Sequence, residues 1–174
     1  MMATADDIKR LREETSCGVI DCKKALEEAK GDFPKAKDLL RKRGLEMAAK
    51  KGDRVAKEGR VESYIHNGNK IGVIVEVNCE TDFVASNDDF CAFTKGLAMH
   101  IAAMNPKYKS KEEVPADVLA KEPDQAAFVK ANCLLSQPFV KDASKSIQDL
   151  LNELIAKIGE NIIISRYLRI KVGE

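Results

Sequence analysis

Apolar residues recur at intervals of three and four through the first 44 positions, and this spacing predicts three short helices. Thr4 and Asp7 have the spacing of an acidic capping box, which marks the start of the first helix. The second helix begins after a break near residue 18 and ends at Gly31, because glycine readily adopts the left-handed conformation that closes helices. Asp32 can cap the third helix, and Gly44 is its predicted end. Residues 1–44 are therefore expected to form a small three-helix bundle.

A pattern typical of strands begins at residue 61. Residues 61–66 and 71–77 are rich in β-branched residues, and the Asn-Gly-Asn sequence at 67–69 predicts a hairpin between them. Near the C-terminus, apolar residues alternate with mostly polar ones, at Ile162, Ile164, Leu168, Ile170 and Val172. This alternation predicts a third strand, which a hairpin needs for independent stability.

Helices are expected between these strands. The Ser-Asn-Asp-Asp sequence at 86–89 can cap a helix with an apolar stripe, and Asn105-Pro106 ends it. Three prolines break residues 107–141 into short helical turns. Ser144 is the predicted start of a last helix with a wide apolar face, and Gly159 ends it. The fold class is α+β, with a three-stranded antiparallel sheet packed with helices behind an N-terminal three-helix bundle.

Residues 45–60 have a different composition from either side. They are rich in Ala, Lys and Arg and offer little apolar surface to a core. We interpret them as a basic, partly helical linker. The predicted organisation is a bundle at 1–44, the linker at 45–60, and an α+β core for dimerisation and partner binding at 61–174.

Composition narrows the function classes. The 174 residues carry 29 basic and 28 acidic side chains, a net charge of +1, which argues against a general nucleic-acid coat and a DNA partner. The five cysteines are odd in number and form no C-x-x-C pair, which favours an intracellular chain with free thiols. No apolar run approaches the roughly 20 residues of a membrane span, and residues 1–7 lack the features of a secretory signal. A cytoplasmic location is expected.

The sequence offers no catalytic, metal or cofactor site. Cys91 and His100 are nine residues apart on one predicted helix, more than two turns, so they cannot form a nucleophile and base pair. Only His66 and His100 are available to a metal, and the cysteines lack ligand spacing. Neither phosphate-binding glycine motif is present, so direct nucleotide binding through such loops is not expected.

Two short segments are candidates for binding another protein. Asp82 and Phe83 follow the second strand directly, where a fixed strand end can present an acid beside an aromatic as a wedge. Pattern alone nevertheless favours a buried loop anchor for Phe83. Val19 and Ile20 are adjacent at the start of a helix and cannot both point into a small core, so one of them should be exposed. A wide apolar face and a docking patch explain that pair about equally well.

The basic segment at residues 35–60 is a further candidate, for RNA. It carries ten Lys or Arg against four Asp or Glu, which is suited to a phosphate backbone. A solvated helix face is the commoner explanation of such a run. No aromatic residue lies between Phe33 and Tyr64, so the stacking surface of a single-strand platform is missing.

Several ordered segments resemble the translation elongation factor Ts family. They are residues 9–15 (KRLREET), 18–26 (GVIDCKKAL), 48–51 (AAKK), 76–85 (EVNCETDFVA), 97–103 (LAMHIAA), 137–140 (QPFV) and 156–162 (AKIGENI). The resemblance implies a guanine-nucleotide exchange factor for elongation factor Tu, which accelerates loss of GDP so that GTP can bind. It also implies a ubiquitin-associated-like N-terminal bundle and a core with a three-stranded antiparallel sheet.

The resemblance assigns roles to individual residues. Asp82 and Phe83 match residues that push between helices of the partner's GTPase domain and disturb its magnesium and phosphate site, with Thr81 and Val84 fixing the loop. Val19 and Ile20 match an apolar pair that docks on the same GTPase domain. Residues 97–103, with Met99 and His100, match a segment placed near a more distal domain of the partner.

The chain departs from the family pattern in several places. Ser16-Cys17 replaces the usual Gly-Ala, and Ser86 stands where family members often carry Lys or Arg. The chain is a short form with one core, which implies a homodimer that completes the binding surface, although residues 121–136 are trimmed even for a short member. Two other functions stay open from the residues: an RNA- or ribosome-binding module using residues 35–60, and a ubiquitin-like-binding adaptor built on the bundle. The adaptor leaves the matches from residue 61 onward unexplained.

Overall fold

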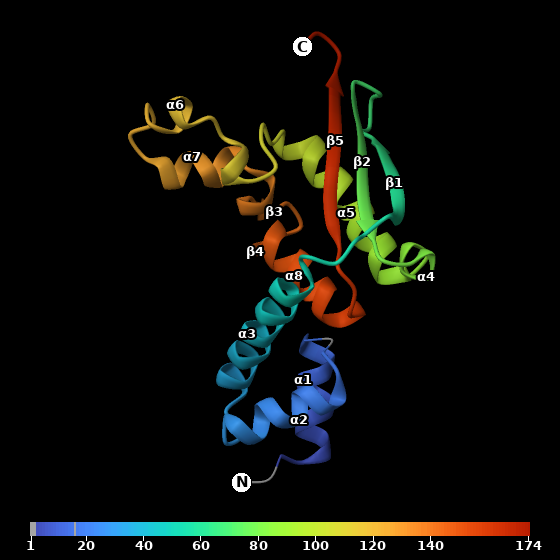
Figure 1. Cartoon of the computed structure of the whole chain (residues 1–174), viewed down its shortest axis with the longest axis vertical. Helices are drawn as coiled ribbons and strands as arrows, with labels where there is room; N and C mark the ends of the chain where they lie inside the picture. Colours follow the sequence, from blue (N-terminus) through green and yellow to red (C-terminus); the bar gives the residue numbers. More distant parts are fainter. Residues whose placement is uncertain (1–2, 16) are drawn as a thin grey trace. The chain divides into compact units, whose positions relative to one another are not determined.

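The computed structural model describes residues 3–15 and 17–174, so Ser16 lies outside the described residues. The chain divides into two compact units (Figure 1). One comprises Met1–Arg54 with Asn152–Asn161, and the other comprises Val55–Leu151 with Ile162–Glu174. The first is helical and the second combines a sheet with helices, which confirms the predicted α+β class.

The first unit contains the three predicted N-terminal helices, α1 (Ala5–Thr15), α2 (Val19–Glu28) and α3 (Phe33–Lys51). The capping box is present, because the backbone N–H of Asp7 donates to the Thr4 hydroxyl and that of Thr4 donates to the Asp7 carboxylate. Gly31 has φ +86°, the left-handed conformation predicted for the end of α2. The helices enclose one apolar cluster, formed by Leu11, Cys22, Ala25, Leu26, Ala29, Ala36 and Leu40.

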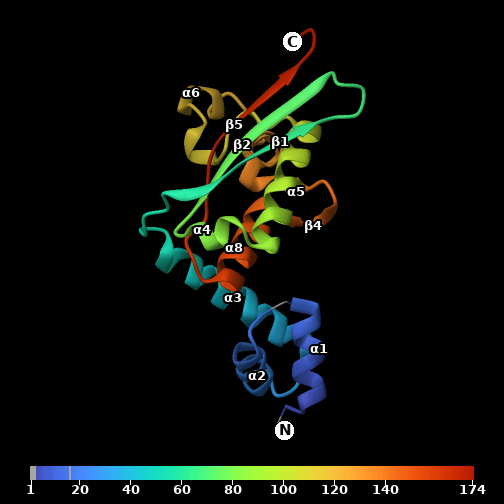
Figure 2. The ribbon, with the colours of Figure 1, turned by 90° about the vertical axis from the view of Figure 1, so that its right-hand side faces the viewer.

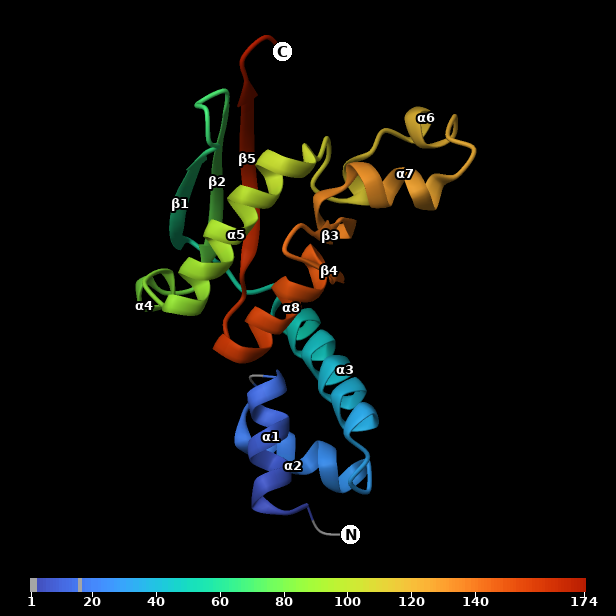
Figure 3. The same cartoon turned by 180° about the vertical axis from the view of Figure 1, so that it is seen from behind.

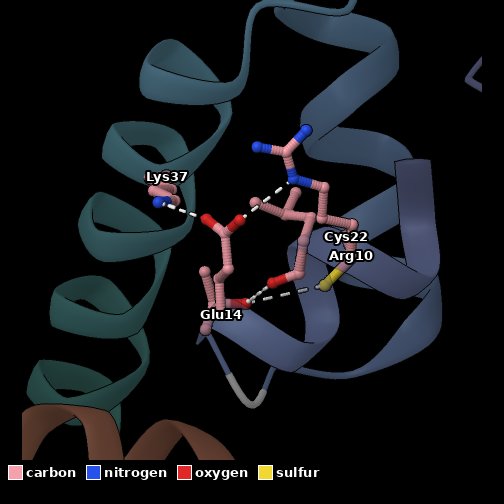
Figure 4. Close-up of polar contacts among 6 residues, drawn as sticks. Arg10, Glu14, Cys22 and Lys37 are labelled. Atoms are coloured by element: carbon pink, nitrogen blue, oxygen red, sulfur yellow. Dashed lines mark hydrogen bonds and ion pairs between the residues drawn. The ribbon is translucent and has the colours of Figure 1, made fainter. Parts of the chain in front are cut away.

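A polar contact on the surface of this unit joins α1 to α3 (Figure 4). The Glu14 carboxylate accepts from the Lys37 ammonium of α3 and from the Arg10 guanidinium of its own helix. These two cations lower the pKa of Glu14 below its usual value, the Lys37 contact being the larger cause. On the same helix, the Thr15 hydroxyl donates to the Leu11 carbonyl and lies 3.8 Å from the Cys22 sulfur of α2.

The predicted end of the third helix at Gly44 is wrong. Helix α3 continues to Lys51, seven residues into the predicted linker. Gly44 is buried in a right-handed helical turn, and a Cβ built there would lie 3.5 Å from the Ala156 methyl group. Its small size therefore serves packing against α8 (Ile147–Ile158) rather than a left-handed cap. The Ala- and Lys-rich residues that follow Gly44 have high helix propensity, which lets the helix continue.

The second unit contains the predicted antiparallel sheet, with β1 (Glu58–Ile65), β2 (Ile71–Cys79) and β5 (Ile163–Lys171) in the order β1-β2-β5. Helix α5 (Asp88–Met104) lies across one face of the sheet, as the opposite views of Figures 1 and 3 show. Its N-cap, Asn87, lies in the predicted capping sequence at 86–89, and the helix ends at Asn105, as predicted, with Asn105 in the left-handed conformation. Val73, Val75 and Val77 are buried beneath it.

The other face of the sheet is uncovered within this unit. Apolar side chains from all three strands lie on it, each between 51% and 70% exposed: Val61, Ile65, Ile74, Leu168, Ile170 and, just past β5, Val172. We call this group the apolar sheet face. Monomeric proteins rarely leave so many neighbouring apolar side chains in water, so this face is suited to contact another surface.

A β-bulge in β5 divides the apolar residues that the alternating pattern placed together. Val77 pairs with Ile164 while Glu76 pairs with Arg166, so Ser165 is the extra residue. Ile162 and Ile164 are buried, whereas the three later apolar residues face solvent. A shift of one residue exchanges the two faces of a strand, and the bulge supplies that shift.

The remaining elements of the second unit are short. They are α4 (Asp82–Ala85), η1 (Lys111–Glu113), α6 (Ala116–Leu119), α7 (Gln125–Asn132), η2 (Leu134–Ser136), β3 (Pro138–Phe139) and β4 (Asp142–Ser146). The last helix, α8 (Ile147–Ile158), starts in the second unit, and its residues from Asn152 onward belong to the first. Its cap is Ser146 with Asp149, two residues later than predicted, because β4 continues past Ser144 to Ser146. No helix in the described part of the chain combines the length and apolarity needed to cross a membrane.

Candidate functional site

The end of β2 leads directly into the candidate site. Three alternate valines and Cys79 are buried along β2, so the strand that carries the site is fixed in the core. Figure 2 shows α4 at the end of β2 opposite the β1–β2 turn. Residues 81–85, which we call the α4 turn, are therefore placed by a strand rather than by a long loop.

The α4 turn is a single helical turn with defined ends. Thr81 has an extended backbone, and its hydroxyl accepts from the Val84 N–H at 3.4 Å, as an N-cap does. The Cys79 thiol donates to the Thr81 carbonyl at 3.1 Å. Within two residues of the end of this turn, Asn87 caps α5. Hydrogen bonds at both ends thus restrict the turn to one local conformation.

This geometry exposes Asp82 and Phe83. Thr81 and Val84 are half-buried against the unit, whereas Phe83 is 84% exposed. The interpretation from pattern alone, a buried Phe83, is wrong: Thr81, Val84 and Ala85 face the protein, and Phe83 lies with Asp82 on the outward side of the turn. Leaving an aromatic ring in water forgoes roughly 2–3 kcal/mol of burial. A rigid turn that holds such a ring outward is typical of a binding anchor.

The second candidate lies in the first unit. Val19 and Ile20 open α2 and are 52% and 69% exposed, so both of them face solvent rather than one. Gly18 is the N-cap of α2 and forms no side-chain cap. A Cβ at Gly18 would lie 3.1 Å from the Asp21 carboxylate, so the glycine leaves space for that side chain. The two apolar side chains are thus held at a helix start and available for contact.

Met99 and His100 have different surroundings from these anchors. His100 is completely buried and Met99 is half-buried. The His100 Nδ1 accepts from the Val140 N–H at 3.2 Å, so its proton lies on Nε2, which donates to the Gln137 Oε1 at 2.9 Å. A direct contact between His100 and a partner would require β3 to move away. The structure therefore favours a supporting role for His100 in the packing of α5.

The buried imidazole makes the stability of this unit depend on pH. Burial lowers the pKa of His100 below its ordinary value near 6.5, with the Gln137 contact opposing the shift. The unfolded chain then binds a proton more readily than the folded chain. We expect the His100 contribution to be complete above about pH 6.5 and to be lost as pH falls through the lower folded-state pKa.

Urea unfolding of the wild type and of His100→Gln, measured from about pH 7.5 to about pH 5, checks this expectation. The free energy of unfolding of the wild type should fall more steeply with decreasing pH than that of the variant. The variant controls for the carboxylates, which titrate equally in both proteins. Parallel curves would contradict a buried neutral histidine.

Cys91 and His100 do not share a partner. The Arg60 guanidinium lies 2.5 Å from the Cys91 sulfur, and the Cys91 thiol lies 3.7 Å from the Ala85 carbonyl, whereas His100 bonds to Gln137. Burial raises the pKa of the Cys22 and Cys133 thiols, which makes their reactive thiolate forms scarcer. In the described part of the chain, no group of three or more His, Cys, Asp or Glu is arranged to hold a metal ion.

Sequence reasoning missed two features near the site. One is the apolar sheet face. The continuous apolar run at residues 71–75 indicated it, because a strand with apolar residues on both sides can bury both of its faces. The other is the side chain of Asn78, which bonds to both neighbouring strands. Nothing in the local pattern indicates that contact, because its partners are distant in sequence.

Phe83 on the α4 turn and Val19 with Ile20 on α2 are large apolar side chains held in solvent, as is typical of a protein that binds another protein. The comparisons then identify the family. A family model described as Elongation factor TS matches residues 20–127. The chain belongs to the elongation factor Ts family, and this membership implies a role in nucleotide exchange during translation elongation, with elongation factor Tu as the partner.

Individual relatives are similar along almost their whole length. Elongation factor Ts of Thermoanaerobacter sp. (strain X514) is 52% identical, covering 99% of this chain and 96% of the relative. That of Caldanaerobacter subterraneus is 51% identical, covering 99% and 98%, and that of Fervidobacterium nodosum is 48% identical, covering all of both chains. The first two alignments run over 196 positions, more than the 174 residues here, so the relatives carry residues that this chain lacks.

Proposed function

We propose that this chain releases GDP from elongation factor Tu by inserting the α4 turn into the partner's GTPase domain. The observation that carries the proposal is Phe83, 84% exposed beside Asp82 on a turn fixed by β2. Phe83 supplies apolar volume and Asp82 supplies charge and hydrogen bonding. Thr81 and Val84, half-buried, hold the turn in shape.

The proposed mechanism needs no covalent chemistry in this chain. A bound guanine nucleotide depends on Mg²⁺ and on aligned backbone N–H groups around its phosphates. Side chains that push between the partner's helices slightly displace the Mg²⁺ and the N–H groups that those helices hold. Because phosphate binding depends on short, well-aligned contacts, a small displacement of these groups strongly weakens the binding of the nucleotide to the partner.

Recycling follows from thermodynamic linkage. If binding of the α4 turn lowers the affinity of the partner for GDP, nucleotide must lower the affinity of the partner for this chain by the same factor. Rebinding of GTP therefore releases the exchange factor, so a small amount of it serves many partner molecules.

The N-terminal unit supplies affinity in this proposal. Val19 and Ile20 dock on the same GTPase domain and hold the factor on its partner, which leaves the α4 turn to act on the nucleotide site. Met99 and the exposed end of α5 lie toward a more distal domain of the partner, with buried His100 keeping that helix in place.

We further propose a homodimer. The apolar sheet face supports it, because two such faces can pack against each other as an aligned sandwich about 10 Å apart. A twofold interface uses the same surface on both copies, so a self-complementary apolar face is suited to it.

The alternative function in RNA or ribosome binding receives less support from the contacts of residues 35–60. Five cations in this segment have partners inside the chain: Lys35 with Asp32, Lys37 with Glu14, Arg43 with Glu28, Lys51 with the Gly159 carbonyl, and Arg60 with Glu62. These contacts reduce the charge that is free to follow a phosphate backbone.

The experiment that tests the proposal is the release of a fluorescent GDP analogue from elongation factor Tu. Catalytic amounts of this chain should raise the release rate by several orders of magnitude, because exchange factors act on a slow spontaneous step. An RNA-binding protein of equal net charge serves as the control. Release at the spontaneous rate would reject the proposed function.

A further inference from the structure

The last residues of β2 lie directly before the α4 turn. The α4 turn begins two residues after β2 ends, so the direction in which Phe83 points depends on how the end of this strand is held. Cys79 faces the core at this point, whereas Asn78 faces the opposite side of the sheet. Asn78 therefore lies on the apolar sheet side, three residues before Thr81.

The Asn78 side chain bonds to both neighbouring strands. Its Nδ2 donates to the Glu58 carbonyl at the start of β1 at 3.1 Å. Its Oδ1 accepts from the Ser165 hydroxyl of β5. One amide therefore connects three strands at the edge of the sheet from which the α4 turn leaves.

Ser165 is the bulge residue of β5, and this makes the contact specific. A bulge bends its strand and increases the local twist, which changes the direction of the strands around it. The unpaired Ser165 has no position in the ladder opposite β2, and its hydroxyl instead bonds to Asn78. The bulge and the end of β2 are thus fixed to each other through a side chain.

The β1 backbone also approaches this point closely. Gly59 pairs with Asn78 and has φ +146°, and a Cβ there would lie 2.3 Å from the Val77 carbonyl oxygen. Only glycine fits this position. The close approach brings the Glu58 carbonyl within reach of the Asn78 amide.

We propose that Asn78 is a positioning residue for nucleotide exchange, which sets the direction of the α4 turn through the end of β2. The inference rests on the proposed function. Asn78 does not touch the partner's nucleotide site in this account; its two hydrogen bonds hold the strand end from which Asp82 and Phe83 project. Loss of the amide leaves the docking surface of the N-terminal unit unchanged and misplaces the turn.

The test compares Asn78→Ala with the wild type in GDP-analogue release from elongation factor Tu. The maximal release rate should fall about tenfold or more, since small misplacements of a reacting geometry have effects of this size. The half-saturating concentration should stay within about twofold, because docking is retained. Asn67→Ala, which removes the same amide at the opposite end of the hairpin, is the matched control and should behave as the wild type.

A double-mutant cycle with Phe83→Ala separates positioning from general destabilisation. If Asn78 acts through the α4 turn, Asn78→Ala should lower the rate no further than about twofold in the Phe83→Ala background. Equal losses in both backgrounds, or a change confined to the half-saturating concentration, would overturn the inference. Ser165→Ala removes one of the two bonds and should give an intermediate loss, which keeps the test decisive if Asn78→Ala folds poorly.

The same cycle distinguishes failure of the proposed function of the α4 turn from failure of the positioning role of Asn78. If Phe83→Ala alone exchanges at the wild-type rate, the proposed function of the α4 turn fails. If Phe83→Ala is impaired while Asn78→Ala and Ser165→Ala are normal, the function stands and the positioning role of Asn78 fails.

Discussion

Replacing Asp82 and Phe83 together with alanine should reduce the maximal rate of GDP release by about 100-fold, because truncation of a central binding anchor typically costs roughly 2–4 kcal/mol. The physical reason is that these two side chains are exposed on the α4 turn, while Thr81 and Val84 are half-buried against the protein. Without them the turn keeps its shape but has nothing to insert between the partner's helices.

The measurement is stopped-flow release of a fluorescent GDP analogue at saturating concentrations of each variant. Thermal unfolding is the control, and it should change little because both side chains are exposed and contribute little to the core. Asp82→Asn keeps the shape of the side chain and removes its charge. Its release rate therefore shows how much of the effect comes from the charge and how much from the volume of the side chains. Release by the double variant at the wild-type rate would remove the α4 turn from the mechanism.

A contrasting variant, Val19→Ser with Ile20→Ser, should change a different kinetic quantity. The half-saturating concentration should rise about tenfold while the maximal rate stays near the wild type, which is the pattern expected for loss of uniform binding. The contrast matters because a poorly folded protein would show both a higher half-saturating concentration and a lower maximal rate. Together the two variants separate docking by α2 from displacement by the α4 turn.

Local signals predicted most of the elements. The Thr4–Asp7 capping box, the Asn-Gly turn at 67–69 and the Asn105 cap depend on residues within one turn of each other, so their chemistry is visible in the sequence. Gly44 shows where such signals fail. A glycine in a helical pattern can mark the end of the helix or a close contact with another element. At Gly44 the contact with Ala156, more than 100 residues away in the sequence, decides for the second.

The third strand shows the same limit more clearly. Its alternation predicted one apolar face, but Ser165 interrupts the register and sends Leu168 and Ile170 to the opposite side from Ile164. A bulge is a property of the pairing between strands, and the sequence of one strand does not contain it. The pattern of β5 by itself therefore did not place Leu168 and Ile170 on the apolar sheet face, on which the homodimer proposal depends.

Phe83 is a third case. An isolated aromatic after a strand is more often buried than exposed, so pattern alone favoured the wrong answer. The exposure depends on the phase of a single helical turn, which the Thr81 cap sets by its bond to the Val84 N–H. The family resemblance carried the correct expectation because it compared the whole segment rather than the hydrophobicity of one residue.

Introducing a charge into the apolar sheet face, by Leu168→Glu, should convert a homodimer into a monomer. In a twofold interface each copy places the new carboxylate against the other, so one substitution acts twice. Desolvation and like-charge repulsion together should raise the dissociation constant roughly 1,000-fold, the equivalent of about 4 kcal/mol. Leu168 is exposed within its own unit, so the fold of the single chain should tolerate the change.

Sedimentation velocity of the wild type and of Leu168→Glu over a wide concentration range measures this. Ala92→Glu, which adds the same charge at an exposed position of α5 on the opposite side of the sheet, is the control and should leave the dimer intact. A wild type that sediments as a monomer at every concentration would refute the dimer. If the second copy completes the surface that binds elongation factor Tu, Leu168→Glu should also weaken that binding while its α4 turn stays intact, and dilution of the wild type below its dissociation constant should weaken binding in the same way.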